Sequence, residues 1–253
     1  MYIEMFYIIV FFLFGLVLGS FFNVVGMRVP KKESIVSPPS HCPNCGTRVK
    51  ARDLIPVVSY IMLGGKCRHC QAKISALYPL VELAAGVLFA IAPLKFGISK
   101  ELLIALPFFS LCLIVFVTDI KYMLIPDKIL LPFAVYFLVV RLFIVPAIPW
   151  WDAFVGALSG FVILFVIAIL SKGGMGGGDI KLFLVLGLIV GWKGVLLTLI
   201  LASFLGAVIG GIGMLLKKIS RREPVPFGPF IIVSAIIVYF YGEAMIRAYV
   251  NLL

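Results

Sequence analysis

Acidic residues are scarce in this sequence: only 11 of its 253 residues are Asp or Glu, against 22 Lys and Arg. Charged residues of both signs make up 13%, and 63% of the chain is hydrophobic, a share that excludes an ordinary soluble domain. The net charge of +11 would suit nucleic acid in a soluble protein. In so apolar a chain, basic residues are instead expected beside membrane helices. We therefore predict a membrane protein that does not bind nucleic acid.

The apolar residues are gathered into runs that approach the roughly 18–20 residues needed for a membrane-spanning helix. The expected spans are 4–26, 78–97, 101–118, 128–148, 152–171, 179–193, 194–216 and 226–250. No basic leading region precedes the first run and no A-x-A-like cleavage site follows it, so we expect a retained helix. No fixed-period repeat indicates a solenoid. The sequence predicts an all-α polytopic membrane protein with about eight transmembrane helices.

The basic residues are distributed unevenly among the connections between these spans. Four segments, at 28–77, 119–128, 172–181 and 217–224, hold 17 of the 22 Lys and Arg. Basic residues favour the cytoplasmic side of a membrane. These four segments are therefore expected in the cytoplasm, with the amino terminus outside. An even number of spans also returns the carboxyl terminus to the outside.

The one long polar stretch, residues 28–77, contains four of the five cysteines. They form two C-x-x-C pairs, Cys42 with Cys45 and Cys67 with Cys70, with 21 residues between the pairs. This spacing is typical of a structural zinc site, in which four thiolates leave no open position for a catalytic water. Two disulfides are the alternative, which a reducing cytoplasm disfavours. We expect a cytoplasmic zinc-knuckle loop between the first two spans.

The two histidines near the cysteine pairs and the fifth cysteine are not expected to bind the metal. Four thiolates already saturate zinc, so we expect the neighbouring His41 and His69 to be bystanders. Cys112 lies alone in an apolar run and is expected to be a small core residue.

Carboxylates at the ends of spans are informative because charge near a membrane is expensive and often functional. Asp119 ends the third expected span, Asp127 begins the fourth, and Asp179 begins the sixth after a run of glycines. Two aspartates that meet at a membrane edge could share a proton and activate water. Asp127 and Asp179 could alternatively be plain helix caps. The bare backbone of Gly176, Gly177 and Gly178 favours catalysis at Asp179, since it would let a substrate strand approach.

Eight short stretches, in this order along the chain, resemble those of the bacterial type IV prepilin peptidases. They are "GSFFNVVGMRVP", "CPNC", "IPVVSYIMLGGKC", "CRHC", "YPLVEL", "DIKYMLIPD", "GGGDIKL" and "PFGPF". The likeness covers nearly the whole chain, and the ordered set is far more specific than any one stretch. The segment between Arg28 and Cys42 is shorter than in many family members, although both cysteine pairs are intact.

The resemblance implies a bifunctional leader peptidase and N-methyltransferase of the inner membrane. Asp119 and Asp179 would be the catalytic pair of a G-x-G-D aspartyl protease, with Asp127, Gly176, Gly178 and Lys181 supporting them. The enzyme would cut prepilins and pseudopilins after a glycine that ends a short basic leader. It would then methylate the new amino terminus with S-adenosylmethionine, an activity linked to the cysteine loop and to Gly65.

Under this interpretation, residues 1–27 form the first transmembrane helix, 28–77 the zinc-binding, methyltransferase-associated loop, and 78–253 the peptidase bundle. Within the loop, nine basic residues against Glu33 and Asp53 would attract anionic lipids and repel a basic leader. Glu82 is therefore a candidate for leader or cofactor binding, unless it only satisfies a neighbouring helix. No G-x-G-x-x-G fingerprint marks the S-adenosylmethionine site.

Two other functions remain open from the residues themselves. The chain could be a peptidase without methyltransferase activity. It could also be a membrane transporter with a zinc-ribbon loop, whose aspartates bind a cation.

Overall fold

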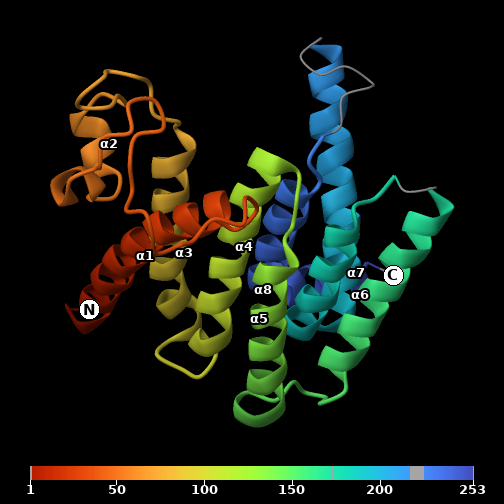
Figure 1. Ribbon diagram of the computed structural model, residues 1–253. Helices are drawn as coiled ribbons and strands as arrows, with labels where there is room; N and C mark the ends of the chain where they lie inside the picture. The colour runs from red at the N-terminus through yellow and green to blue at the C-terminus, as the bar shows by residue number, and fades with distance from the viewer. Residues whose placement is uncertain (1, 172–173, 217–224, 253) are drawn as a thin grey trace. The chain divides into compact units, whose positions relative to one another are not determined.

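The computed structural model describes residues 2–171, 174–216 and 225–252 (Figure 1). All the regular elements within these ranges are helical, apart from two isolated bridges in the cysteine loop. The chain divides into two compact units, Met1–Val117 and Thr118–Leu253. The segments 172–173 and 217–224, predicted to be cytoplasmic, lie outside the described residues.

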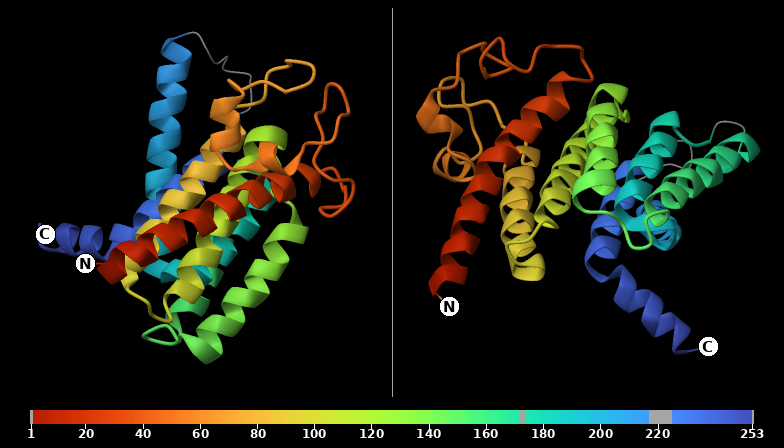
Figure 2. Two further views of the ribbon diagram at one scale, coloured as in Figure 1. Left: turned by 90° about the vertical axis from the view of Figure 1, so that its left-hand side faces the viewer. Right: turned by 90° about the horizontal axis from the view of Figure 1, so that it is seen from below.

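The first unit is built on α1 (Tyr2–Arg28) and α3 (Leu77–Phe96), which lie side by side (Figures 1 and 2). Two glycines of α1 make this close approach possible. A Cβ built at Gly15 would lie 2.5 Å from the carbonyl oxygen of Ala85, and one at Gly19 would lie 2.7 Å from the Cα of Glu82. Small residues at such contacts allow membrane helices to pack through their backbones.

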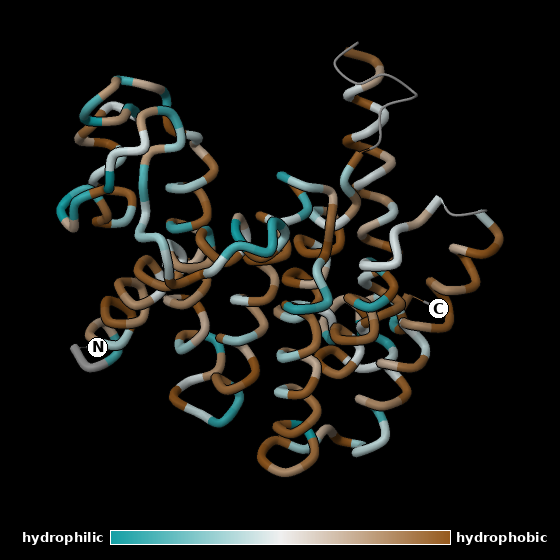
Figure 3. Tube along the Cα trace, in the orientation of Figure 1, coloured by the Kyte–Doolittle hydropathy of each residue, from teal (hydrophilic) through white to brown (hydrophobic). Residues whose placement is uncertain are grey.

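The cysteine loop joins these two helices and stands out as the polar part of the unit (Figure 3). It contains the short helices η1 (Ala51–Leu54) and α2 (Val58–Met62). Each C-x-x-C pair lies in a tight turn closed by an isolated antiparallel bridge. These bridges join His41 to Arg48 and Lys66 to Lys73.

The second unit holds the end of α4 (Leu102–Tyr122) and four further helical segments. They are α5 (Asp127–Val139), which continues into the π-helical turn η2 (Val140–Ile144), α6 (Asp152–Leu170), α7 (Gly177–Leu215) and α8 (Gly228–Val250). The helices α6 and α7 cross backbone to backbone, since a Cβ built at Gly156 would lie 2.5 Å from the carbonyl oxygen of Gly187. The helix α7 also packs against α5 and α8.

Six of the described helices, namely α1, α3, α4, α6, α7 and α8, are long and apolar enough to span a membrane. The fourth predicted span coincides with α5 and η2, and the sixth and seventh both lie on α7. The all-α, multi-pass architecture is thus confirmed. The predicted junction between residues 193 and 194 is displaced, because the backbone of α7 leaves helical geometry at Gly191 (φ 69°, ψ −179°).

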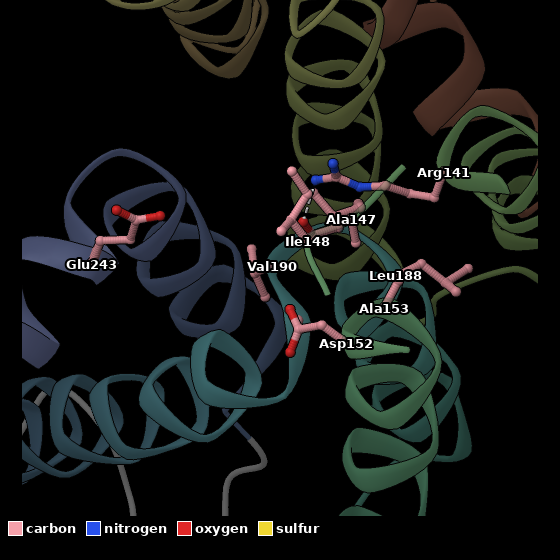
Figure 4. A pocket seen from close by; sticks show the side chains of 10 residues that line it. Arg141, Ala147, Ile148, Asp152, Ala153, Leu188, Val190 and Glu243 are labelled. Carbon is pink, nitrogen blue, oxygen red and sulfur yellow. Dashed lines mark hydrogen bonds between the residues drawn. The ribbon is translucent and has the colours of Figure 1, made fainter. Parts of the chain in front are cut away.

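The break in α7 leaves backbone groups without helical partners, and two charged side chains supply them. The guanidinium Nη2 of Arg141 donates to the carbonyl oxygen of Ile189 at 2.7 Å. The N–H of Trp192 donates to Asp152 Oδ1 in a longer contact of 3.4 Å. Each charge has the sign that the adjacent helix end favours. Arg141 and Asp152 line one cavity of about 180 Å³, together with Glu243 (Figure 4).

We expect Gly191→Ala to lower the stability of the protein by about 3 kcal/mol, because a φ of 69° with extended ψ is open essentially to glycine. The new Cβ would also collide with the carboxylate of Asp152. Thermal unfolding in detergent measures the effect. Gly210→Ala is the matched control on the same helix, since its Cβ would meet no atom within 4 Å. Equal unfolding temperatures for the two variants would contradict the break at Gly191.

Candidate active site and metal-binding loop

Asp119 lies near the carboxyl-terminal end of α4, with only 6% of its surface exposed. Its Oδ2 accepts a hydrogen bond of 2.8 Å from the backbone N–H of Gly228, the first residue of α8. The amino-terminal end of a helix carries partial positive charge and favours a carboxylate. The start of α8 therefore holds the Asp119 carboxylate in place.

Asp179 lies in the first turn of α7 and is half-buried. Its side chain accepts a hydrogen bond from the backbone of Gly176. The two aspartates, 60 residues apart in the chain, lie close enough for the charge of Asp119 to act on Asp179. The second unit alone thus brings together the two carboxylates that the sequence singles out.

The three glycines before Asp179 have different surroundings. A Cβ built at Gly178 would lie 2.8 Å from the Cβ of Ile125, so this glycine allows α7 to begin against the segment before α5. A Cβ at Gly176 would lie 3.1 Å from Asp179 Oδ2. At Gly177 it would meet no atom within 4 Å. Close packing against Ile125 therefore explains Gly178, whereas Gly176 and Gly177 are both exposed.

Asp127 and Lys181 form an ion pair that joins the start of α5 to the start of α7. The Nζ of Lys181 lies 2.8 Å from Oδ1 and 2.7 Å from Oδ2 of Asp127. Asp127 is the first residue of α5, and Pro126 occupies the N-cap position. Both side chains are more than half exposed, at 52% for Lys181 and 67% for Asp127, so the pair adds little stability. The pair joins the two helix starts close to Asp179, which lies two residues before Lys181.

Gly228 is the residue at this site to which the sequence analysis assigned no role. A Cβ built on it would lie 2.6 Å from Asp119 Oδ2, so only glycine fits while its N–H donates to that oxygen. The sequence feature that could have indicated this role is the "PFGPF" stretch, which contains Gly228 at the start of the last span.

The four paired cysteines form one cluster in the first unit. Their sulfur atoms all lie within 4.8 Å of one another, and Cys42 Sγ is 3.8 Å from Cys70 Sγ. A tetrahedron with metal–sulfur bonds of about 2.3 Å has edges of about 3.8 Å, so the cluster has the size of a Cys₄ metal site.

Backbone hydrogen bonds favour the thiolate form of Cys67 and Cys70. The N–H groups of Cys70 and His69 lower the pKa of Cys67, and the N–H of Ala72 lowers the pKa of Cys70. Metal ligation requires the thiolate, which such hydrogen bonds favour. Each turn contains one residue with positive φ, Gly46 in the first and Gln71 in the second.

Gly65 and Glu82, the other two candidates, both support the segment around α2. Gly65 has a φ of 68°, and a Cβ there would lie 2.9 Å from the hydroxyl of Tyr60. Glu82 is 8% exposed on α3, and its Oε2 accepts a 2.7 Å hydrogen bond from the N–H of Val57. Roles for Gly65 and Glu82 in methylation or leader binding stay predictions.

Two family models match consecutive parts of the chain. The bacterial peptidase A24 N-terminal domain matches residues 13–96, and the type IV leader peptidase family matches residues 106–211. No solved structure was found to match the chain.

Relatives named prepilin leader peptidase/N-methyltransferase match almost the full length. The protein from Bacillus subtilis is 42% identical over 95% of this chain and 97% of its own. The protein from Pseudomonas aeruginosa is 34% identical over 94% of this chain and 92% of its own. The protein from Aeromonas salmonicida is 32% identical over 95% of this chain and 92% of its own. The chain therefore belongs to the type IV leader peptidase family.

Proposed function

We propose that this protein cleaves the leader peptides of prepilins and pseudopilins and then methylates the new amino terminus. The observation that carries the peptidase part is the convergence of Asp119 and Asp179 within one helical unit. The near full-length likeness to relatives named for both activities supports the methyltransferase part.

Peptide cleavage by this pair requires one carboxylate to accept a proton from water and the other, protonated, to donate a hydrogen bond to the scissile carbonyl. The water oxygen then bonds to the carbonyl carbon, and the departing amine takes up a proton as the peptide bond breaks. Two nearby carboxylates share a proton readily because their charges repel. The Gly228 N–H keeps Asp119 oriented for this exchange.

The active site is proposed to face the cytoplasm, with the amino terminus outside. This orientation rests on the excess of Lys and Arg in the segments that hold the aspartates and the cysteine loop. Water could then reach the aspartates while the apolar stem of the substrate enters from the bilayer. An unwound peptide bond requires such a protein-lined, hydrated place.

The methyl donor is proposed to be S-adenosylmethionine, which supplies an electrophilic methyl group to the free amine. The cysteine cluster is proposed to hold a structural Zn²⁺, for which its donor set and spacing fit. A zinc ion bound there would hold the loop in its folded form. The side chains of the loop carry a net charge of +7, which suits contact with anionic lipids.

A single assay tests the proposal. Purified protein is incubated with a synthetic prepilin and S-adenosylmethionine, and the product is weighed by mass spectrometry. Loss of the leader with a gain of about 14 Da, the mass of one methylene, is the expected result. Cleavage without that gain in mass would indicate a peptidase that has no methyltransferase activity. An intact precursor, with cation flux that depends on Asp179, would favour the transporter.

Neighbouring glycines should respond differently to the same substitution. We expect Gly178→Ala to reduce cleavage by at least about tenfold, since the new Cβ forces α7 away from Ile125 and displaces Asp179. Gly177→Ala should cleave at a rate close to that of the parent protein, because its Cβ would meet open space. Initial cleavage rates measure both. Equal losses in the two variants would mean that the packing of Gly178 does not position Asp179.

Removal of one thiol from the cysteine cluster should impair zinc binding and methylation without impairing cleavage. We expect Cys67→Ser to reduce bound zinc from about one per chain to a small fraction and to impair methylation, with cleavage retained. Elemental analysis and the mass assay measure these outcomes. Cys112→Ala is the control, since this cysteine lies apart from the cluster in α4. One zinc per chain in the Cys67→Ser protein would contradict a Cys₄ site.

A further inference from the structure

The segment from the end of η1 through α2 exposes large apolar side chains beside a charged loop. Ile61 is 70% exposed and Met62 is 78% exposed. We call the exposed apolar residues here the apolar edge: Leu54, Ile55, Val58, Ile61 and Met62. Contiguous apolar surface of this kind is rarely left in water by soluble proteins and marks a contact site.

The apolar edge is tied to a definite depth along α3. Val57, within the edge segment, donates its N–H to the buried Glu82 Oε2 at 2.7 Å. Glu82 lies five residues beyond Leu77, the start of α3, which places it about 7.5 Å along the helix axis. The Ser20 side chain also hydrogen-bonds Glu82, so α1 helps to hold this carboxylate.

A second contact keeps α2 beside the start of α3. The hydroxyl of Tyr60 donates to the carbonyl oxygen of Ile74 at 3.4 Å, three residues before that helix begins. The edge segment is therefore held at two points, one on each side of Leu77. It lies level with the first turns of α3 and does not project freely into the cytoplasm.

The same level of α3 presents a surface suited to lipid. Leu80 and Leu83, in the turns around Glu82, are exposed apolar residues on a helix that qualifies as a membrane span. The hydrogen bond from Val57 to Glu82 thus ties the apolar edge to a part of α3 that would meet lipid if this helix spans the membrane. Interfacial helices place their apolar faces about 5–10 Å into the boundary between headgroups and acyl chains.

The charge around the apolar edge also favours contact with membrane lipid. Exposed basic residues flank it in sequence on both sides: Lys50, Arg52, Lys66 and Lys73. Arg68 is already engaged by Asp53, with the shortest nitrogen–oxygen contact at 2.6 Å. Basic residues around an apolar segment favour anionic lipid headgroups.

We infer that the apolar edge is inserted into the lipid interface beside α3, at a depth set by Glu82, with the flanking basic residues on anionic headgroups. The cysteine loop is then a membrane-attached element whose four-cysteine cluster is held close to the bilayer. The contacts that hold the apolar edge all lie within the first unit and are independent of the proposed reaction.

Photocrosslinking of the full-length protein tests this insertion. p-Benzoylphenylalanine replaces Met62 or, in a matched protein, the exposed His69 of the second cysteine turn. Each protein is irradiated in nanodiscs of phosphatidylethanolamine and phosphatidylglycerol, and adducts are identified by mass. We expect lipid adducts at position 62 to exceed those at position 69 several-fold. Crosslinks from position 62 to this chain or to a second copy, or equal lipid yields at both positions, would overturn the insertion.

Variants of Glu82 test how the depth is set. Glu82→Leu removes the acceptor for Val57, so lipid adducts at position 62 should fall at least threefold. Glu82→Gln keeps an oxygen that can accept the same hydrogen bond, and its adduct yield should match that of the parent protein. The unfolding temperature of each variant reports whether the chain is still folded. A folded Glu82→Leu protein with unchanged adducts would overturn the role of Glu82.

Discussion

Asp119→Asn and Asp179→Asn should each reduce prepilin cleavage by about 10³-fold or more, because each removes a group that must exchange a proton in the reaction. Asparagine is nearly the same size as aspartate, so the fold should survive. The expected loss applies to either variant alone, since the mechanism needs both carboxylates. Initial rates on a synthetic prepilin in detergent measure it.

The matched control is Glu243→Gln, which neutralises an exposed carboxylate on α8 that pairs with Arg247. This variant should cleave at the parent rate. Methylation of a pre-cleaved substrate should also persist in both aspartate variants, because the proposed methyltransferase loop lies in the other unit. Substantial cleavage by both single variants would refute the two-aspartate mechanism.

The positions of the spans were predictable from sequence because the bilayer imposes a minimum length on each apolar run. The break in α7 was placed two residues too late, at a junction next to the charged Lys193. The local signal was Gly191, since its backbone conformation strongly favours glycine. Which glycine breaks a helix, among the many in membrane spans, depends on neighbours such as Asp152 that only the folded chain supplies.

The candidate site was partly predictable because its chemistry is carried by side chains. Asp119 and Asp179 stood out through the scarcity of acidic residues and through the motifs around them. The pairing of Asp127 with Lys181 joins residues 54 positions apart, and no local sequence pattern predicts such a contact. The bond from Gly228 to Asp119 spans 109 positions and uses a backbone N–H, which every non-proline residue possesses.

Gly228→Ala should reduce cleavage by about 100-fold, although it changes no ionisable group. The added Cβ would lie 2.6 Å from Asp119 Oδ2, a separation that real Cβ contacts essentially never show. Either the Asp119 side chain rotates away or α8 withdraws, and both movements lengthen the Gly228 hydrogen bond. A displacement of about 1 Å at a reacting group can reduce a rate by about 10². Cleavage rates at saturating prepilin measure the loss.

The comparison that isolates this contact uses Gly211→Ala, a glycine-to-alanine change on α7 where the new Cβ would meet no atom within 4 Å. Both variants add one methyl group and lower backbone freedom alike, so stability differences between them report only local packing. Gly228→Ala should lower kcat with little change in KM, since the added Cβ displaces a reacting carboxylate. If it cleaves as fast as Gly211→Ala, the start of α8 does not orient Asp119, and the carboxylate must be held by other groups.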